Sequence, residues 1–286
     1  MTALGEWIVV LGGQRYRVQP SWARLPGGRD LESLSQVAVD SRGHIYALQR
    51  ADPPVVVFDP DGHFVSTIGD GLILDSHGIA VDPQDRIWVV DRDAHQLVVF
   101  DKEGRLLMRL GERGRPRLGL PFNHPTDVAF AADGEIYVSD GYGNACVHRF
   151  SADGRHLGSW GEPGRGPAQF STPHAVWVDK NNRVLVADRE NDRIQIFDRE
   201  GRFLTMWEDV YRPMDIFETP QGILVSDQVP RVTLFALDGR VAGRCRPVLN
   251  GAHGIWGGLN GSIFCAEMIP SRLTRLEPVP AADDGQ

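Results

Sequence analysis

The chain has 286 residues, of which 42% are hydrophobic and 24% are charged, as is ordinary for a globular protein with a sizeable core. Its formal net charge of -8 argues against a general phosphate-binding surface, so we expect no nucleic-acid partner. No stretch approaches the roughly 18 apolar residues that span a membrane, and no signal-peptide pattern is present. We therefore expect no membrane partner and a cytoplasmic location.

The three cysteines form no CxxC pair and no even-numbered disulfide framework. They are Cys146, Cys245 and Cys265. We expect buried thiols in a reducing compartment.

The first thirty residues contain two expected strands, over residues 7–11 and 16–19, and then a Pro/Gly-rich stretch at 25–28. From about residue 32 a unit recurs: an apolar strand, a turn and a second strand. Its six copies align on Val37, Ile79, Val128, Val176, Ile216 and Ile255. The spacing of 39 to 49 residues is typical of a four-stranded blade with loop insertions.

A second recurring sequence pattern supports this alignment of the repeats. In five copies a phenylalanine precedes a turn whose glycine lies four residues further on. These glycines are Gly62, Gly104, Gly154, Gly201 and Gly239. Acidic or small residues begin the turns and glycine accepts a positive φ, which is hairpin chemistry. No window has a convincing helical period, so helix should be scarce.

Six such units predict an all-β, six-bladed β-propeller. The sixth copy has only about three strands and ends near Leu276. We expect an N-terminal strand, over residues 16–19, to supply its outer strand and close the ring. Residues 1–277 are then one propeller domain, and residues 278–286 are a disordered tail.

The residue two places before each alignment position is the most informative one. These residues are Ser35, His77, Thr126, His174, Met214 and His253. Nine histidines scattered over 286 positions would place fewer than one on any six chosen positions. Histidines in blades two, four and six would point at one axis, where neutral imidazoles can share Zn²⁺ or another divalent transition metal. A lone histidine at such a position would instead be a packing residue.

The other six histidines are expected to face solvent or loops. They are His44, His63, His95, His124, His148 and His156.

The loop after the second strand of each blade holds a recurrent carboxylate, most simply a structural hydrogen-bond acceptor. Arg50 and Arg189 lie in this loop in blades one and four, which face each other across the ring. Two such cations beside a metal suit a substrate carboxylate. The alternative is that both are ordinary surface arginines.

Several phrases resemble the peptidyl-α-hydroxyglycine α-amidating lyases, a group within the NHL-repeat propellers. The stretches that carry the resemblance are Ser76-His77-Gly78, Pro125 to Ala129, Val138 to Asn144, Pro173-His174 and Val186 to Asn191. The resemblance covers roughly residues 35–275. It implies that His77, His174 and His253 bind zinc, that Tyr142 is the catalytic base, and that Arg50 and Arg189 line the active site.

The chain also departs from that family. Gly254 stands where the family has a carboxylate, which puts the family's structural calcium in doubt, and Gly251 stands where it has a methionine in the active-site wall. The positions of the paired cysteines in secreted animal enzymes are Asn123, Gly143, Leu185 and Ile196 here. No copper monooxygenase domain is present in this sequence, so the substrate need not be a peptide.

Our hypothesis is that the protein is a zinc-dependent carbon–nitrogen lyase. It would cleave an N-(α-hydroxyalkyl) amide, of the α-hydroxyglycine type, into an amide and glyoxylate or an aldehyde. The substrate is a small molecule or peptide that can bear a carboxylate. One alternative is a metal-dependent hydrolase, such as a lactonase, on the same three histidines. The other is a non-enzymatic NHL propeller that binds protein. The oligomeric state does not follow from the sequence.

Overall fold

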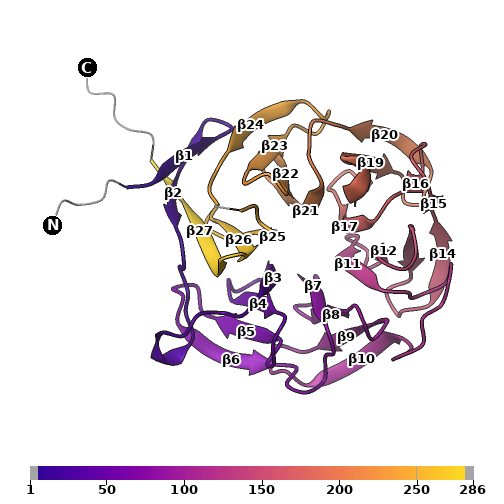
Figure 1. Ribbon diagram of the computed structural model, residues 1–286, viewed down its shortest axis with the longest axis horizontal. Coiled ribbons are helices and arrows are strands. Elements are labelled where there is room, and N and C mark those ends of the chain that lie inside the picture. The colour runs from indigo at the N-terminus through magenta and orange to yellow at the C-terminus, as the bar shows by residue number, and fades with distance from the viewer. Residues whose placement is uncertain (1–5, 249, 281–286) are drawn as a thin grey trace.

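The computed structural model describes residues 6–248 and 250–280, and its strands form a ring of six antiparallel sheets (Figure 1). In these residues the helical elements are two short 3-10 turns, Pro26–Gly28 and Arg189–Asn191. No helix in them is long and apolar enough to cross a membrane. The expected all-β six-bladed propeller is confirmed. The glycines of the five predicted turns all have positive φ.

The blades follow one another along the chain, each beginning with its innermost strand. Blade one is β3 (Leu34–Val39), β4 (Ile45–Gln49), β5 (Val55–Phe58) and β6 (Phe64–Ile68). Blade two is β7 (Ser76–Val81), β8 (Ile87–Asp91), β9 (Gln96–Phe100) and β10 (Leu106–Gly111). Blade three is β11 (Pro125–Phe130), β12 (Ile136–Asp140), β13 (Cys146–Phe150) and β14 (His156–Trp160).

The second half of the ring repeats this order. Blade four is β17 (Pro173–Val178), β18 (Val184–Asp188), β19 (Arg193–Phe197) and β20 (Phe203–Trp207). Blade five is β21 (Pro213–Thr219), β22 (Gly222–Asp227), β23 (Val232–Phe235) and β24 (Val241–Cys245). A two-residue parallel pair, β15 (Glu162–Pro163) and β16 (Gln169–Phe170), lies in the connection between blades three and four.

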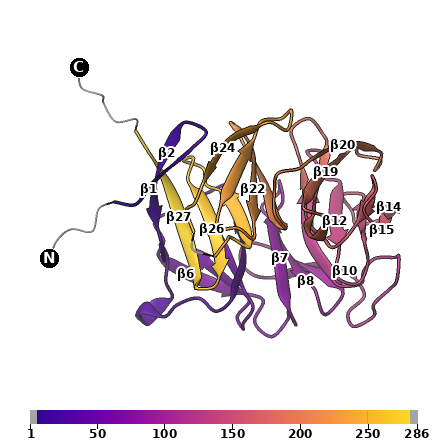
Figure 2. The same cartoon turned by 45° about the horizontal axis from the view of Figure 1, so that its top comes forward.

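Blade six closes the ring with strands from both ends of the chain. Its sheet runs β25 (Gly254–Gly257), β26 (Ile263–Met268), β27 (Ser271–Val279), β2 (Gln14–Gln19) and β1 (Ile8–Leu11). The expected N-terminal strand is therefore present as β2, and β1 adds a fifth strand outside it (Figure 2).

The C-terminal boundary differs from the expectation. β27 continues to Val279, because Tyr16 and Arg15 of β2 pair with Pro278 and Val279. These two residues belong to the blade and not to a tail. Of the rest of the expected tail, Pro280 follows the strand and is exposed, and residues 281–286 lie outside the described residues.

Apolar side chains of neighbouring blades pack against each other and form the core. Blades one to five bury their two middle strands almost completely, for example β8 and β9 in blade two. All three cysteines are buried and free, as expected. The six inner strands surround the axis, and the side chains that they turn toward it make the site.

Candidate metal centre

The inner strands carry an irregularity at the position where the histidines occur. The pairing of β7 with β8 shifts its register between Ser76 and Gly78, so His77 is the extra residue. The pairing of β17 with β18 shifts in the same way around His174. A bulged residue leaves the ladder and its side chain is re-aimed. The bulge therefore turns each of these imidazoles toward the axis.

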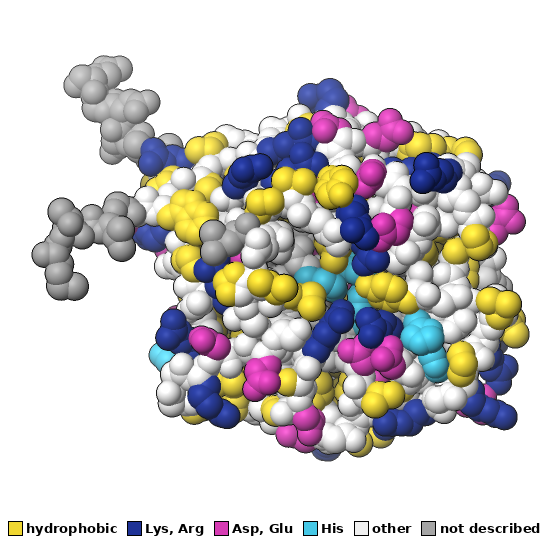
Figure 3. Space-filling view, viewed as in Figure 1, with side chains coloured by type: hydrophobic (Ala, Val, Ile, Leu, Met, Phe, Trp, Pro, Cys, Tyr) yellow, Lys and Arg dark blue, Asp and Glu magenta, His cyan; other side chains and the backbone are white. Residues whose placement is uncertain are grey.

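The three predicted ligands converge. The ligand atoms of His77, His174 and His253 all lie within 4.8 Å of one another. Their ring centroids are 4.9, 5.0 and 5.2 Å apart, so the three imidazoles form a nearly equilateral triangle. Histidine side chains are visible at the floor of the central hollow, with Lys and Arg side chains around it (Figure 3).

Each imidazole is oriented by the blade that follows it. The Nδ1 atoms contact backbone carbonyls at the equivalent position of the next blade. The pairs are His77 with Thr126 at 2.7 Å, His174 with Met214 at 2.7 Å and His253 with Ser35 at 2.8 Å. Because a carbonyl only accepts, Nδ1 carries the hydrogen and each Nε2 keeps its lone pair. The odd blades thus supply carbonyls and the even blades supply ligands.

The surroundings keep these imidazoles neutral. Burial lowers the pKa of His77 and His174 well below the usual value, and it lowers the pKa of His253 to about 3; neighbouring imidazoles and arginines add to the effect. His174 Nε2 is buried and has no hydrogen-bond partner in the described residues. Three neutral nitrogen donors, each held by a backbone carbonyl, are the donor set and the outer support that a divalent transition metal such as Zn²⁺ requires.

Tyr142 lies at the edge of this triangle. Its hydroxyl oxygen is 3.2 Å from His77 Nε2 and 3.0 Å from Arg189 Nη1. Since Arg189 can only donate, the phenol accepts from Arg189 and donates its own hydrogen to His77. A cation on His77 Nε2 would take the lone pair that this hydrogen bond uses. The phenol would then be free for another partner.

Two guanidinium groups flank the Tyr142 ring, with Arg92 Cζ 5.2 Å and Arg189 Cζ 5.3 Å from its centroid. Arg92 was missed in the sequence analysis, which selected arginines from blades that face each other. It occupies the same loop position in blade two as Arg50 and Arg189 do in theirs, so the same alignment could have found it. Asp75 holds it through an ion pair of 2.6 Å.

Arg50 differs from the other two arginines. Burial lowers the pKa of its guanidinium below the usual value, and its Nε is buried without a hydrogen-bond partner in the described residues. Arg189 is paired with Glu190 at 2.9 Å, and Arg92 with Asp75 and Asp93. Of these three arginines, Arg50 is therefore the one with a buried N–H donor that has no hydrogen-bond partner in the described residues.

A cavity of about 590 Å³ is lined by Arg50, Tyr142, Arg189 and His253 of this site. Its lining also includes the apolar side chains of Met214, Met268 and Ile269. The cavity therefore offers both cationic and apolar groups to a ligand.

The two departures from the lyase family have local reasons. Gly251 lines the cavity with φ of +88°, and an added Cβ would lie 2.7 Å from the backbone oxygen of Asp227. An added Cβ at Gly254 would lie 1.8 Å from Gln36 Oε1. Neither position admits the family's side chain without a shift of its neighbours.

A second set of polar side chains lies next to the histidines, and the sequence analysis did not predict it. Gln36, Asp127 and Asp215 are each one residue before the alignment position of an odd blade, where the even blades have glycine or alanine. Burial raises the pKa of Asp127 well above its usual range and that of Asp215 to about 7. Asp215 accepts hydrogen bonds from Gln36 Nε2 at 2.9 Å and from Ile255 N at 2.6 Å.

Comparison with known proteins confirms the repeat. Residues 77–100, 122–150 and 170–197 match the NHL repeat family model. These segments coincide with blades two, three and four.

Two relatives carry different names. NHL repeat-containing protein 3 of Homo sapiens is 33% identical over 226 residues, which cover 72% of this chain and 65% of the relative. A protein named "Probable peptidyl-alpha-hydroxyglycine alpha-amidating lyase pgal-1", from Caenorhabditis elegans, is 27% identical over 292 residues, which cover 87% of this chain and 83% of the relative. The chain spans 59–65% of the length of the mouse and human NHL repeat-containing protein 3.

Among solved structures, a gluconolactonase of Xanthomonas campestris, XC5397, superposes with a TM-score of 0.72 over 93% of this chain and 90% of its own. At 18% sequence identity this likeness supports the fold and nothing finer.

Proposed function

We propose that this chain is a metal-dependent carbon–nitrogen lyase that acts on N-(α-hydroxyalkyl) amides. The observation that carries the proposal is the contact of the Tyr142 hydroxyl with His77 Nε2 and Arg189, at the edge of three neutral imidazoles. Tyr142, Arg50, Arg189 and one of the three histidines, His253, line one cavity.

His77, His174 and His253 would hold the metal, which supplies Lewis-acid polarisation of a substrate oxygen when bound. Tyr142, as phenolate, is within reach of a substrate hydroxyl held at the centre and accepts its proton. Arg50 would take a substrate carboxylate, since its donors are buried and partly unused. The apolar wall of Met214 and Met268 would take the acyl group.

The reaction balances without a further reactant. The substrate hydroxyl loses its proton to Tyr142, a carbon–oxygen double bond forms, and the carbon–nitrogen bond breaks. The electron pair of that bond stays on nitrogen, which takes up a proton. The products are a primary amide and glyoxylate or another aldehyde.

The relatives support this proposal in part. The Caenorhabditis elegans relative is named as an amidating lyase, and it matches over most of both chains. The human relative is named only by its repeats. The support for the proposed substrate therefore comes from the residues of the site and not from the relatives' names.

The test combines metal analysis with a substrate screen. Purified protein should contain Zn²⁺ or a similar ion at the three-histidine centre and release glyoxylate from α-hydroxyglycine derivatives. His174→Ala should lose this metal and the activity together, whereas Val10→Ala, at an exposed edge strand, should keep both. Metal-dependent opening of lactones with no glyoxylate release would favour the hydrolase alternative, and neither metal nor turnover would favour a protein-binding propeller.

A further inference from the structure

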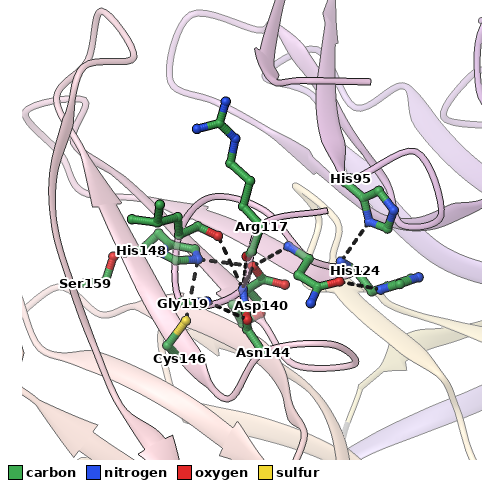
Figure 4. Close-up of polar contacts among 12 residues, drawn as sticks. His95, Arg117, Gly119, His124, Asp140, Asn144, Cys146, His148 and Ser159 are labelled. Atoms are coloured by element: carbon green, nitrogen blue, oxygen red, sulfur yellow. Dashed lines mark hydrogen bonds and ion pairs between the residues drawn. The ribbon is translucent and has the colours of Figure 1, made fainter. Parts of the chain in front are cut away.

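A second group of metal-ligating side chains lies inside blade three, away from the three-histidine centre. Asp140, Cys146 and His148 are buried, and their ligand atoms lie within 4.8 Å of one another. Figure 4 shows the three side chains pointing toward one another. This also corrects the expectation for His148, which has no solvent exposure, and His95 is likewise buried.

Blade four provides an internal reference for this group. There the carboxylate at the end of the second strand, Asp188, is equally buried. It accepts hydrogen bonds from Asn191 Nδ2 at 2.9 Å and Gln195 Nε2 at 3.1 Å, and Arg193 neutralises it through an ion pair of 2.8 Å. This buried anion therefore has a matching cation.

Blade three keeps the arrangement but replaces the cation. Asn144 Nδ2 donates to Asp140 at 2.9 Å, as Asn191 does in blade four. His148 pairs with Val138 as Gln195 pairs with Val186, and Cys146 is opposite Asp140 as Arg193 is opposite Asp188. A thiol thus stands where blade four has a guanidinium.

In three further blades the carboxylate that ends the second strand also has a donor from the third strand or its entry loop. The donor is an arginine in blades five and six and the neutral side chain of Gln96 in blade two. The pairs are Gln96 with Asp91 at 3.0 Å, Arg231 with Asp227 at 2.8 Å and Arg272 with Glu267 at 2.7 Å. Blade one has Gln49 in place of a carboxylate. Blade three alone combines a buried carboxylate with a cysteine at this place in the described residues.

We propose that Asp140, Cys146 and His148 form a second metal site, for Zn²⁺ or a similar borderline ion. A carboxylate, a thiolate and a neutral imidazole carry two negative charges together, which a divalent cation balances. Mixed sulfur, nitrogen and oxygen donors suit Zn²⁺. The ion would supply the positive charge that Arg193 supplies in blade four.

Two further contacts support the site. Asp140 Oδ1 is buried and has no hydrogen-bond partner in the described residues, so it retains an unused lone pair. His148 Nε2 lies 3.1 Å from Asp140 Oδ2 and 3.5 Å from Cys146 Sγ, so without a metal it donates to the carboxylate. Nδ1 lies 2.6 Å from Ser159 Oγ, and when a cation replaces the hydrogen on Nε2, Nδ1 can donate to this hydroxyl. Such an outer hydrogen bond is typical of histidine ligands.

Binding requires loss of the thiol proton. Burial raises the pKa of Cys146 to about 12, with a contribution from the charge of Asp140, so without a cation the thiol stays protonated at neutral pH. The metal takes the place of this proton, which leaves to solvent. Because all three ligands are buried, the ion should be taken up as the blade folds.

The experiment uses the whole chain expressed with Co²⁺ as the metal probe. Thiolate ligation to Co²⁺ gives a near-ultraviolet charge-transfer absorption that the three-histidine centre, which has no sulfur donor, cannot give. We expect this absorption in the wild type and in His77→Ala, with one metal equivalent fewer in the variant. Cys245→Ser, a change at another buried thiol, is the matched control and should keep the absorption.

Two variants separate metal ligation from folding. Cys146→Arg and His148→Gln install the residues that blade four uses, so they should abolish the absorption and one metal equivalent while the chain stays folded by circular dichroism. A folded wild type that shows no thiolate absorption, or an absorption that survives in folded Cys146→Arg, would overturn the proposal. His148 would then be a plain hydrogen-bond donor to Asp140, as Gln195 is to Asp188.

Discussion

The proposed lyase and the hydrolase alternative differ in the role that they give to Tyr142. Its hydroxyl accepts from Arg189 at 3.0 Å and points its own hydrogen at His77 Nε2 at 3.2 Å. In a hydrolase, a water molecule activated at the centre would attack, and the phenol would only help to position the substrate.

Tyr142→Phe is therefore the first prediction. Removal of a general base typically costs about 10²–10⁴ in rate, so kcat on an α-hydroxy amide should collapse while bound metal stays at the wild-type level. Both quantities should be measured on one preparation, together with the thermal midpoint. A Phe variant within about tenfold of wild type would end the case for Tyr142 as the base.

The arginines give the second prediction. Arg50→Ala should lower kcat/KM for a carboxylate-bearing substrate by about 10- to 100-fold more than for its neutral amide analogue, because a charge-assisted hydrogen bond contributes roughly 1.5–3 kcal/mol. Arg189→Ala should show the same preference. Arg92→Gln is the control, since Asp75 and Asp93 already occupy its donors. An equal loss on charged and neutral substrates would remove the carboxylate role of Arg50.

At the scale of elements, blades three and four are joined by an ion-pair network at the turn before β12. Glu135 contacts Arg149 at 2.7 Å and Arg199 of blade four at 2.8 Å, and it accepts from Tyr137 at 2.8 Å. Burial alone would raise the pKa of Glu135, but these donors outweigh it and lower the pKa to about 2. The network is partly shielded from solvent, since the Glu135 side chain is 18% exposed.

The third prediction follows from that lowered pKa. As pH falls, Glu135 of the unfolded chain takes up its proton at a pKa near 4.5, whereas Glu135 of the folded chain does so only near 2. The contribution of Glu135 to the stability of the fold is therefore present above pH 4.5 and is lost as pH falls toward 2. Glu135→Gln should reduce the free energy of unfolding by about 1–3 kcal/mol at pH 7, and the difference should shrink steadily between pH 4.5 and 2. Urea titrations across this range measure it. A difference independent of pH would mean that the carboxylate charge is irrelevant there.

The repeat allowed the strands and the three histidines to be predicted, because both recur at the same point of each unit. The carbonyls of Thr126, Met214 and Ser35 could not be foreseen, since a backbone acceptor leaves no mark on residue type. The bulge at His77 was hidden for the same reason.

The sequence analysis did not predict which of the four cysteine positions of the secreted enzymes are neighbours here. In the structure Leu185 pairs with Ile196 across two strands, and Gly143 N donates to Asn123 O at 3.0 Å.

At the scale of the whole molecule, one sheet joins both ends of the chain. β2 pairs with β27 over five residues, and Tyr16 packs in a core cluster with Leu234 and Leu276. The edge that β27 would otherwise expose is thereby covered, which propellers need for a closed ring.

The last prediction tests this closure. Tyr16→Ala should cost about 3–5 kcal/mol of unfolding free energy, as for other buried aromatic side chains, because Tyr16 is 7% exposed. Val10→Ala in the neighbouring strand should change it by less than about 0.5 kcal/mol, because Val10 is 53% exposed. Urea unfolding of both variants gives the comparison. A Tyr16→Ala variant as stable as Val10→Ala would show that the closed ring does not depend on the packing of Tyr16 between β2 and β27.

The pairing of β2 with β27 also has a consequence for synthesis on the ribosome. Arg17 is paired with Glu277, 260 positions later, so β1 and β2 must wait for β27. Blades one to five can each form from neighbouring hairpins as they leave the exit tunnel, whereas blade six cannot. A nascent chain halted between β2 and β27 leaves β2 without its partner strand. Synthesis must therefore pass β27 before the propeller can have its native topology.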